Sequence, residues 1–512
     1  MRSFAAGAAL CVAIAGCGST VQIKGHSVVT ADGGTTLPSG TTSQAAGAGE
    51  SLGTSGGALP GTGGGRTTST ATTGQTQPDG QAANPGLTPV SASAPGLTAT
   101  EIKIGITYLV NGGAAAAAAG YDVNRGNEEQ NWRAVVAEVN ARGGLAGRRL
   151  VPVFYAFDAQ STQPASSQEA AECAAFTQDN KVFAVVTNGS PDFTACLARY
   201  GVLHATTGNY DGHDRAFYQR FPMFLEQRPS QERYQADLVS ALVRQKYFTG
   251  WDTLRAAPGT APTKLGILVI DRSDYLRPLQ EVLLPALRRA GHPVDPSLVA
   301  RVPIYSTGQD AGPVAAATKN AVLRFQQDGV THVIILDANG TTTALFAQNS
   351  QSQLYFPRLG VTSASGIQQL YDLKALSEKQ VNGSAGLGWT PILDLPVGQG
   401  DKYLSKAAPD CLNVIKRRTG QSFSSTTAAG VAMFACDAVF PLATMLKNLT
   451  GPLTASGAVQ AIEHFGRRIP AASVPYLAFS PTRHDGLETA FDMAWDTSCP
   501  CVRYKDAGHR LP

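Results

Sequence analysis

From residue 101 onward, apolar runs of strand length alternate with segments of helical periodicity. The first strands are EIKIGITYLV (101–110), RLVPVFYAFD (149–158), VFAVVTN (182–188) and GVLHATT (201–207). Helices are expected at residues 126–142, 164–179 and 230–245. Continuously apolar strands that alternate with helices predict a parallel sheet covered by helices on both faces.

The alternation then begins a second time. Strands are expected at residues 264–271, 299–304 and 331–337, and helices at 275–290, 312–327 and 341–350. Residues 98–512 are about 415 residues, more than one hydrophobic core comfortably serves. The sequence therefore predicts an α/β fold of two doubly wound lobes with parallel central sheets.

The first 17 residues predict export and lipid anchoring. Arg2 precedes an unbroken small or apolar run at residues 4–15, which is too short to span a bilayer and fits a signal peptide. The run leads into Ile14-Ala15-Gly16-Cys17, which resembles a bacterial lipobox, so Cys17 is the predicted lipidation site. The alternative is an ordinary cleaved signal with an incidental cysteine.

Residues 18–97 contain no Phe, Trp or Tyr and are rich in Gly, Ser, Thr, Ala and Pro. Such a segment cannot bury enough apolar area to offset its ordering entropy, so it is expected to be a disordered tether. The domains expected are a signal peptide (1–17), the tether (18–97) and a folded module (98–512).

Charge and motifs argue against two classes of function. The net charge of +3 is not concentrated in any Lys/Arg block, which argues against nucleic-acid binding. The predicted folded module (98–512) has no Gly-x-Ser-x-Gly, His-Glu-x-x-His or P-loop motif, and the Gly-x-Ser-x-Gly matches at residues 49–53 and 53–57 fall in the Gly-rich predicted tether, so the protein is not expected to be an enzyme. No cofactor or metal is expected, because Cys499-Pro500-Cys501 has neither redox nor zinc spacing. Asp485-Gly486 is expected to form a hairpin turn.

Candidate binding residues follow the strands, because ligands bind at the carboxyl ends of parallel strands. Asn188, Gly189 and Ser190 end one strand, and Pro191 then begins a helix, so that free amides and the Ser190 hydroxyl form an expected anion site. Asp337 ends a later strand and is a further candidate.

Four stretches resemble one family. They are TEIKIGITYLV, AVVAEVNARGGLAGRRLVPVFYAFDAQ, GVLHATTGN and FSPTRHDGLETAFDMAWD. Together they resemble the type I periplasmic binding proteins, in the branch that binds branched-chain amino acids for ABC importers. The resemblance implies a three-strand hinge, with crossings near residues 226–229, 386–391 and 469–475. It implies one lobe at about 98–226 and 389–470, and another at about 227–388 and 471–512.

The resemblance also implies binding roles for particular residues. The loop that binds a ligand carboxylate matches Thr187-Asn188-Gly189-Ser190, and the next polar loop matches Thr206-Thr207-Gly208. Tyr275 matches the aromatic residue that closes over the ligand. The family's acid for a ligand ammonium should lie near Thr362, where this sequence has no acid, and Asp274 or Asp337 would have to substitute. A standard branched-chain amino acid is therefore not the expected ligand.

Six cysteines follow the leader, an even number that suggests disulfides in an exported protein. The family often ties together the helices that hold Cys173 and Cys196, which implies that pair. Cys411 and Cys436 lie in consecutive predicted helices and are expected to pair. Cys499 and Cys501 either pair with each other or remain free.

The expected function is capture of a small polar solute by hinge closure and delivery to an ABC permease. The protein would act as a monomer, exported and anchored by lipid to the outer face of the cell membrane. The alternatives are a ligand-sensing receptor on the same fold without transport, or an enzyme without a recognised motif. Neighbouring permease and ATPase genes would favour transport, and a neighbouring kinase gene would favour sensing.

Overall fold

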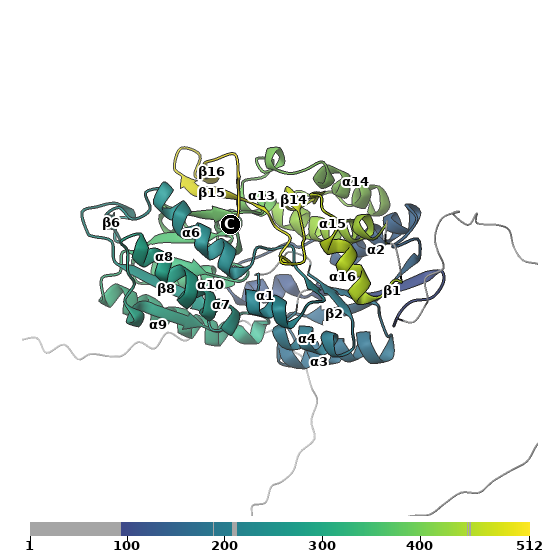
Figure 1. Cartoon of the computed structure of the whole chain (residues 1–512). Helices are drawn as coiled ribbons and strands as arrows, with labels where there is room; N and C mark the ends of the chain where they lie inside the picture. Colours follow the sequence, from purple (N-terminus) through teal and green to yellow (C-terminus); the bar gives the residue numbers. More distant parts are fainter. Residues whose placement is uncertain (1–93, 188, 207–211, 448, 450–451) are drawn as a thin grey trace, which may run out of the picture. The chain divides into compact units, whose positions relative to one another are not determined.

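The computed structural model describes residues 94–187, 189–206, 212–447, 449 and 452–512. The predicted signal peptide, Cys17 and nearly all of the predicted tether lie outside the described residues, as do Asn188, Thr207 and Gly208. The described residues contain two large β-sheets (Figure 1).

The first sheet is parallel and has the strand order β2-β1-β3-β4-β5. Its strands are β1 (Glu101–Val110), β2 (Arg149–Asp158), β3 (Ala184–Val186), β4 (Leu203–Ala205) and β5 (Phe224–Leu225). Its helices from the N-terminal half of the chain are α1 (Gly112–Ala118), α2 (Glu128–Ala141), α3 (Ala165–Ala174), α4 (Pro191–Arg199) and α5 (Arg215–Arg220). Three later helices share its hydrophobic core: α14 (Ala407–Thr419), α15 (Thr426–Leu446) and α16 (Ala455–Glu463).

The second sheet has the order β16-β15-β12-β11-β10-β8-β9, with β17 paired to β15. Its parallel strands are β8 (Leu265–Ile270), β9 (Val299–Val302), β10 (His332–Leu336), β11 (Arg358–Thr362) and β12 (Ala385–Gly388). The antiparallel strands are β15 (Thr489–Asp496), β16 (Cys501–Tyr504) and β17 (His509–Arg510). Its helices include α6 (Gln231–Arg244), α7 (Ser273–Pro278), α8 (Leu284–Arg289), α9 (Ala311–Gln327), α10 (Thr341–Ser352), α11 (Ile367–Asp372) and α12 (Glu378–Val381).

The chain passes three times between the two sheets. It leaves the first sheet after β5 and returns after β12 through α13 (Pro391–Asp394). It leaves again after β13 (Ile469–Pro470), which pairs with β14 (Tyr476–Leu477). The two sheets and these connections are the two-lobed α/β architecture that the sequence predicted.

Buried carboxylates hold the connecting segments in place. Asp437 on α15 accepts hydrogen bonds from the amide of Ser473, at 2.8 Å, and from its hydroxyl, at 2.6 Å. Asp485 accepts the Ser230 amide at 2.7 Å and an Arg233 guanidinium nitrogen at 2.6 Å. The hairpin turn expected at Asp485-Gly486 is closed between Ser480 and Arg483 instead, where each residue's amide bonds the other's carbonyl oxygen.

Three disulfides join cysteines that are close in sequence. Cys173–Cys196 links α3 to α4, Cys411–Cys436 links α14 to α15, and Cys499–Cys501 closes the β15–β16 turn. The first two are the predicted pairs, and the third settles the alternative left open for Cys499 and Cys501.

Helix α15 is the one described helix that is long and apolar enough to cross a membrane by length and composition. Its most apolar window has a mean hydropathy of 1.7, and 83% of that window is buried inside the protein. Its burial in the core of the first sheet accounts for this composition.

Candidate functional site

A cavity of about 200 Å³ lies between the two sheets, near the carboxyl ends of their strands. From the first sheet it is lined by the end of β1 and by residues that follow β3 and β4, including Thr107, Ser190 and Thr206. From the second sheet it is lined by Arg272 after β8 and by Tyr305 after β9. This is the position in which open parallel sheets bind ligands.

Aromatic side chains form much of the cavity wall. Trp132 of α2, Phe434 of α15 and Tyr305 are buried, and Tyr108 and Phe157 complete the aromatic lining. An adjoining cavity of about 130 Å³ extends toward the loops after β10 and β11. The two cavities share Leu109, Arg125, Tyr305, Ser306, Val431 and Phe434.

The predicted anion-binding loop holds a carboxylate of the protein itself. The Ser190 amide donates to Glu169 Oε1 at 3.0 Å, and the Ser190 hydroxyl donates to Glu169 Oε2. Ser190 is also the N-cap of α4, where its Oγ accepts the Phe193 amide at 3.2 Å. Burial raises the pKa of Glu169, although the two hydrogen bonds from Ser190 oppose that shift. The loop therefore holds the carboxyl group of Glu169, and the binding of a solute anion there stays a prediction.

The cationic side chains of the cavity have acidic neighbours. Arg125 Nε lies 2.5 Å from Glu128 Oε1, and Arg272 pairs with Asp274 at 2.6 Å. Arg125, Glu128 and Arg272 line the cavity, and each cation is thus largely neutralised within the protein.

His213 lines the cavity beside Glu226, with 3.3 Å between its Nδ1 and the carboxylate. Burial alone would lower the pKa of His213, but Glu226 and Asp274 outweigh burial and raise it. Two buried polar atoms of the lining have no hydrogen-bond partner among the described residues, namely His213 Nε2 and Thr206 Oγ1. His213 Nε2 lies 4.0 Å from Asp274 Oδ2, and buried polar atoms such as these are normally hydrogen-bonded.

The structure places the predicted binding residues in two groups. Gly189 and Ser190 line the cavity. Tyr275 is fully buried in the core of the second sheet, and its hydroxyl lies 3.4 Å from the Asp337 carbonyl oxygen. Asp337 accepts hydrogen bonds from the Thr343 amide and hydroxyl at the start of α10.

Thr362 is buried at the end of β11, where it begins a short helical turn with Ser365. Tyr275, Asp337 and Thr362 line neither of the two cavities. The roles assigned to these three residues stay predictions.

Several lining residues were not predicted from the sequence, among them Arg125, Glu169 and His213, whereas Arg272 lies in the predicted contact loop 271–275. A signal for Glu169 was present. The pairing of Cys173 with Cys196 places α3 beside α4, and Glu169 lies one helical turn before Cys173. That geometry brings its carboxylate to the start of α4, where a negative charge is stabilised. Arg125 and His213 lie in loops, which have no periodic sequence pattern from which the position of a side chain could be predicted.

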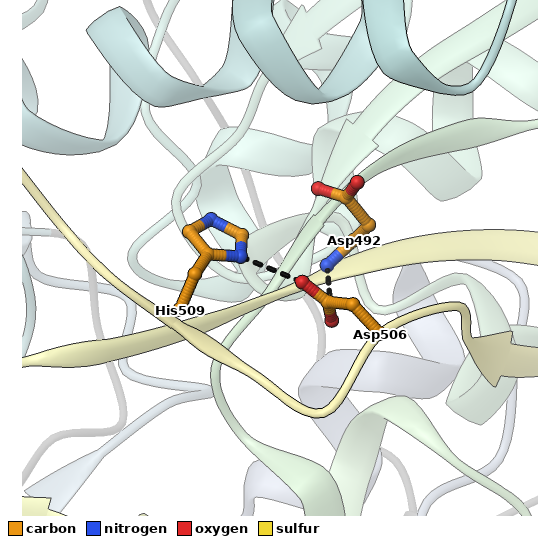
Figure 2. Close-up of side chains that lie close together, drawn as sticks. All are labelled: Asp492, Asp506 and His509. Atoms are coloured by element: carbon orange, nitrogen blue, oxygen red, sulfur yellow. Dashed lines mark hydrogen bonds and ion pairs between the residues drawn. The ribbon is translucent and has the colours of Figure 1, made fainter.

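A separate acidic cluster lies around strands β15 and β17 of the second sheet, near the C-terminus of the chain. Asp492, Asp506 and His509 bring ligand-type atoms within 4.8 Å of one another (Figure 2). Arg244 holds Asp492 through two hydrogen bonds of 2.8 and 2.6 Å. The His509 ring bonds Asp506 at 2.7 Å and Asp237 at 2.6 Å. These partners make the cluster an ion-pair network that fastens the C-terminal segment to α6.

Comparisons with known proteins show similarity at the level of structure. No protein-family model and no curated protein matches the chain by sequence. A leucine-binding protein from Thermotoga maritima is 14% identical, with a TM-score of 0.53, and the match covers 79% of this chain and 98% of that one. A fatty acid ABC transporter substrate-binding protein from Thermomonospora curvata is 17% identical, with a TM-score of 0.53 and coverage of 82% and 95%.

A solute-binding protein of an ABC transporter from Rhodopseudomonas palustris, in complex with p-hydroxybenzoic acid, is 14% identical. Its TM-score is 0.56, and the match covers 80% of this chain and 98% of that one. The chain therefore has the type I periplasmic binding protein fold, as its sequence predicted.

Proposed function

We propose that this protein captures a small polar solute in the cavity between its two sheets and delivers it to an ABC importer. The observation that carries the proposal is the cavity itself, which both sheets line at the carboxyl ends of their strands. Its lining combines aromatic walls with charged and hydrogen-bonding groups, the composition typical of small-molecule sites. The structural neighbours are substrate-binding proteins of ABC transporters, which supports the same function.

Capture proceeds by closure of one lobe on the other. A solute first contacts the strand ends of one sheet, and closure then brings the second sheet against it and excludes water. The solute stabilises the closed state only by the difference between its affinities for the two states. The groups from the second sheet, Arg272 and Tyr305 among them, supply that difference.

The test is native mass spectrometry of the full-length purified protein, followed by calorimetric titration with each solute found. The expected result is one small molecule bound per chain with release on unfolding. A chemically changed product in place of the bound solute would show turnover and replace the proposal with an enzymatic one. Transport itself is tested by solute uptake in cells with and without the gene, because a sensing receptor would leave uptake unchanged.

We further propose that the protein is exported and held by a lipid on Cys17, with residues 18–97 as the tether. The motif Ile14-Ala15-Gly16-Cys17 supports this. Replacing Cys17 with Ala should move the protein from the membrane fraction to the soluble fraction, whereas Cys11→Ala should not. Membrane retention of Cys17→Ala at the wild-type level would place the anchor elsewhere.

A further inference from the structure

The anion-binding loop of the cavity carries its own carboxylate, which changes what the cavity can accept. The Glu169 carboxyl group accepts hydrogen bonds from the Ser190 amide and the Ser190 hydroxyl. A solute carboxylate at this loop would have to displace Glu169 or lie against it. Displacement breaks two charge-assisted hydrogen bonds, and contact between two carboxylates raises the free energy of binding.

The other charges of the cavity do not compensate for Glu169. Among the described residues, the glutamates that line it are Glu128, Glu169 and Glu226, and the cationic or titratable bases are Arg125, Arg272 and His213. Arg125 and Arg272 pair with Glu128 and Asp274, and His213 lies against Glu226. Among the described Lys, Arg and His residues, none makes an ion pair with Glu169, which feels Arg272 only at longer range.

The remaining lone pairs of Glu169 therefore offer a hydrogen-bond acceptor with a negative charge on the cavity wall. A buried negative charge without a cation is costly, and a solute cation would remove that cost. Thr206 Oγ1 and His213 Nε2 have no hydrogen-bond partner among the described residues, although His213 Nε2 lies 4.0 Å from Asp274 Oδ2, and both add polar groups to the same cavity.

The size and walls of the cavity limit the rest of the solute. An apolar cavity of about 150 Å³ holds benzene, so a cavity of about 200 Å³ suits a solute of about one ring. Trp132, Phe434 and Tyr305 provide flat apolar surfaces for such a body.

We propose that the cavity selects a one-ring-sized primary amine, with its ammonium group on Glu169 and its apolar body against Trp132 and Phe434. This inference rests on the proposed function and names the chemical class of its solute. Glu169 acts as the specificity residue, because it replaces the solute carboxylate at the Ser190 loop.

The test compares three probes of matched shape, benzylamine, benzyl alcohol and sodium benzoate, by calorimetric titration of the full-length protein. Wild type should bind benzylamine at least about ten-fold more tightly than benzoate. Glu169→Gln should weaken benzylamine binding at least about ten-fold and reduce or reverse the preference for benzylamine over benzoate. Glu281→Gln, the same side-chain change at an exposed helical position that does not line the cavity, should leave all three affinities within about two-fold.

Proton release gives a second measurement. Burial raises the pKa of Glu169, and a bound ammonium lowers it again, so that amine binding releases protons in mildly acidic buffer. Titrations in buffers of different ionisation enthalpy should show this release with wild type and Glu169→Asp, and lose it with Glu169→Gln. Circular dichroism spectra that match wild type establish that each variant is folded.

Tighter binding of benzoate than of benzylamine by wild type would overturn the amine assignment. So would a benzylamine affinity that Glu169→Gln leaves unchanged, or a failure of wild type to bind any of the three probes. A solute retained in native mass spectrometry would still support capture in each of these cases. The proposed function fails separately, when no solute is retained and none of a broad panel binds.

Discussion

Two glutamates one turn apart on α3 meet different surroundings. Glu169 faces the cavity and the Ser190 loop, whereas Glu172 is 1% exposed and accepts a hydrogen bond from Thr107 Oγ1 at 2.5 Å. Burial raises the pKa of Glu172 to about 8, with Glu169 adding to the shift and the Thr107 hydrogen bond opposing it. Glu172 is therefore protonated in the folded protein at neutral pH.

This difference predicts a pH-dependent stability. The pKa of Glu172 rises from 4.5 to about 8 on folding, so its contribution to stability is greatest below pH 4.5 and is lost as the pH rises to about 8. Ionisation above that range costs up to about 5 kcal/mol, since one pKa unit corresponds to about 1.4 kcal/mol. Glu172→Gln mimics the protonated form, so it should match wild type at pH 5 and be more stable by several kcal/mol at pH 9.

Urea unfolding of both proteins at pH 5, 7 and 9 measures the effect. The control is Glu281→Gln on an exposed helical surface, which should shift stability by less than about 0.5 kcal/mol at every pH. A stability difference between Glu172→Gln and wild type that does not grow between pH 5 and pH 9 would contradict the prediction.

At the scale of elements, the disulfides differ in how much chain they enclose. Cys411–Cys436 joins α14 and α15 across a separation of 25 residues, and both cysteines are buried in the core. Cys499–Cys501 spans a separation of 2 residues. In the chain-entropy account, closing the longer loop contributes about 3 kcal/mol and the shorter about 1 kcal/mol.

Replacing Cys411 and Cys436 together by Ala should therefore lower the free energy of unfolding by about 3 kcal/mol or more, because two buried sulfur atoms are also lost. Replacing Cys499 and Cys501 together by Ser is the matched comparison and should cost about 1 kcal/mol. Chemical denaturation under non-reducing conditions measures both. Equal losses for the two double variants would show that loop closure is not the main contribution of the longer disulfide.

The same elements show what could be predicted from sequence. β8 and β10 are buried along their length because both faces of a parallel sheet are covered, and β1 carries buried isoleucines at positions 102, 104 and 106, so the positions of these strands could be predicted. β5 and β13 have two residues each, too few for any periodicity. Pairing with neighbours, which the sequence does not display, defines such strands.

The candidate site residues also divide into those whose place at the cavity could be predicted from the sequence and those whose place could not. Gly189 and Ser190 were found because a strand end followed by Ser-Pro marks a helix start. Tyr275 and Asp337 also follow strands, but the packing of α7 and α10 turns both into the core of the second sheet. Position after a strand fixes the end of the sheet at which a residue lies, and tertiary packing decides whether its side chain reaches the cavity.

At the scale of the whole molecule, contacts around α1 hold the two sheets together. Tyr305 donates to the Ala115 carbonyl oxygen at 2.8 Å, and Gln348 of α10 donates to that of Ala119 at 2.9 Å. The Tyr121 and Thr341 hydroxyls lie 3.1 Å apart. The segment after β1 thus fastens the first sheet to the second.

These contacts predict that a substitution outside the cavity can destabilise the closed arrangement of the two lobes. Gln348 lines neither cavity, and its hydrogen bond to Ala119 joins elements of the two sheets. Loss of one such bond costs about 1 kcal/mol, which changes the ratio of closed to open molecules about five-fold. Gln348→Ala should therefore populate the open arrangement more than wild type does.

Spin labels on Lys319→Cys of α9 and Asp410→Cys of α14, both exposed, report the distance between the lobes by double electron–electron resonance. Without solute, Gln348→Ala should gain a longer-distance population relative to wild type. The control is Gln353→Ala, at an exposed position just after α10, which should leave the distance distribution unchanged. Identical distributions for Gln348→Ala and wild type would show that the α1 contacts do not set the balance between open and closed states. A saturating solute should return Gln348→Ala to the wild-type closed distance, because solute binding and the Gln348 contact both stabilise the same closed state.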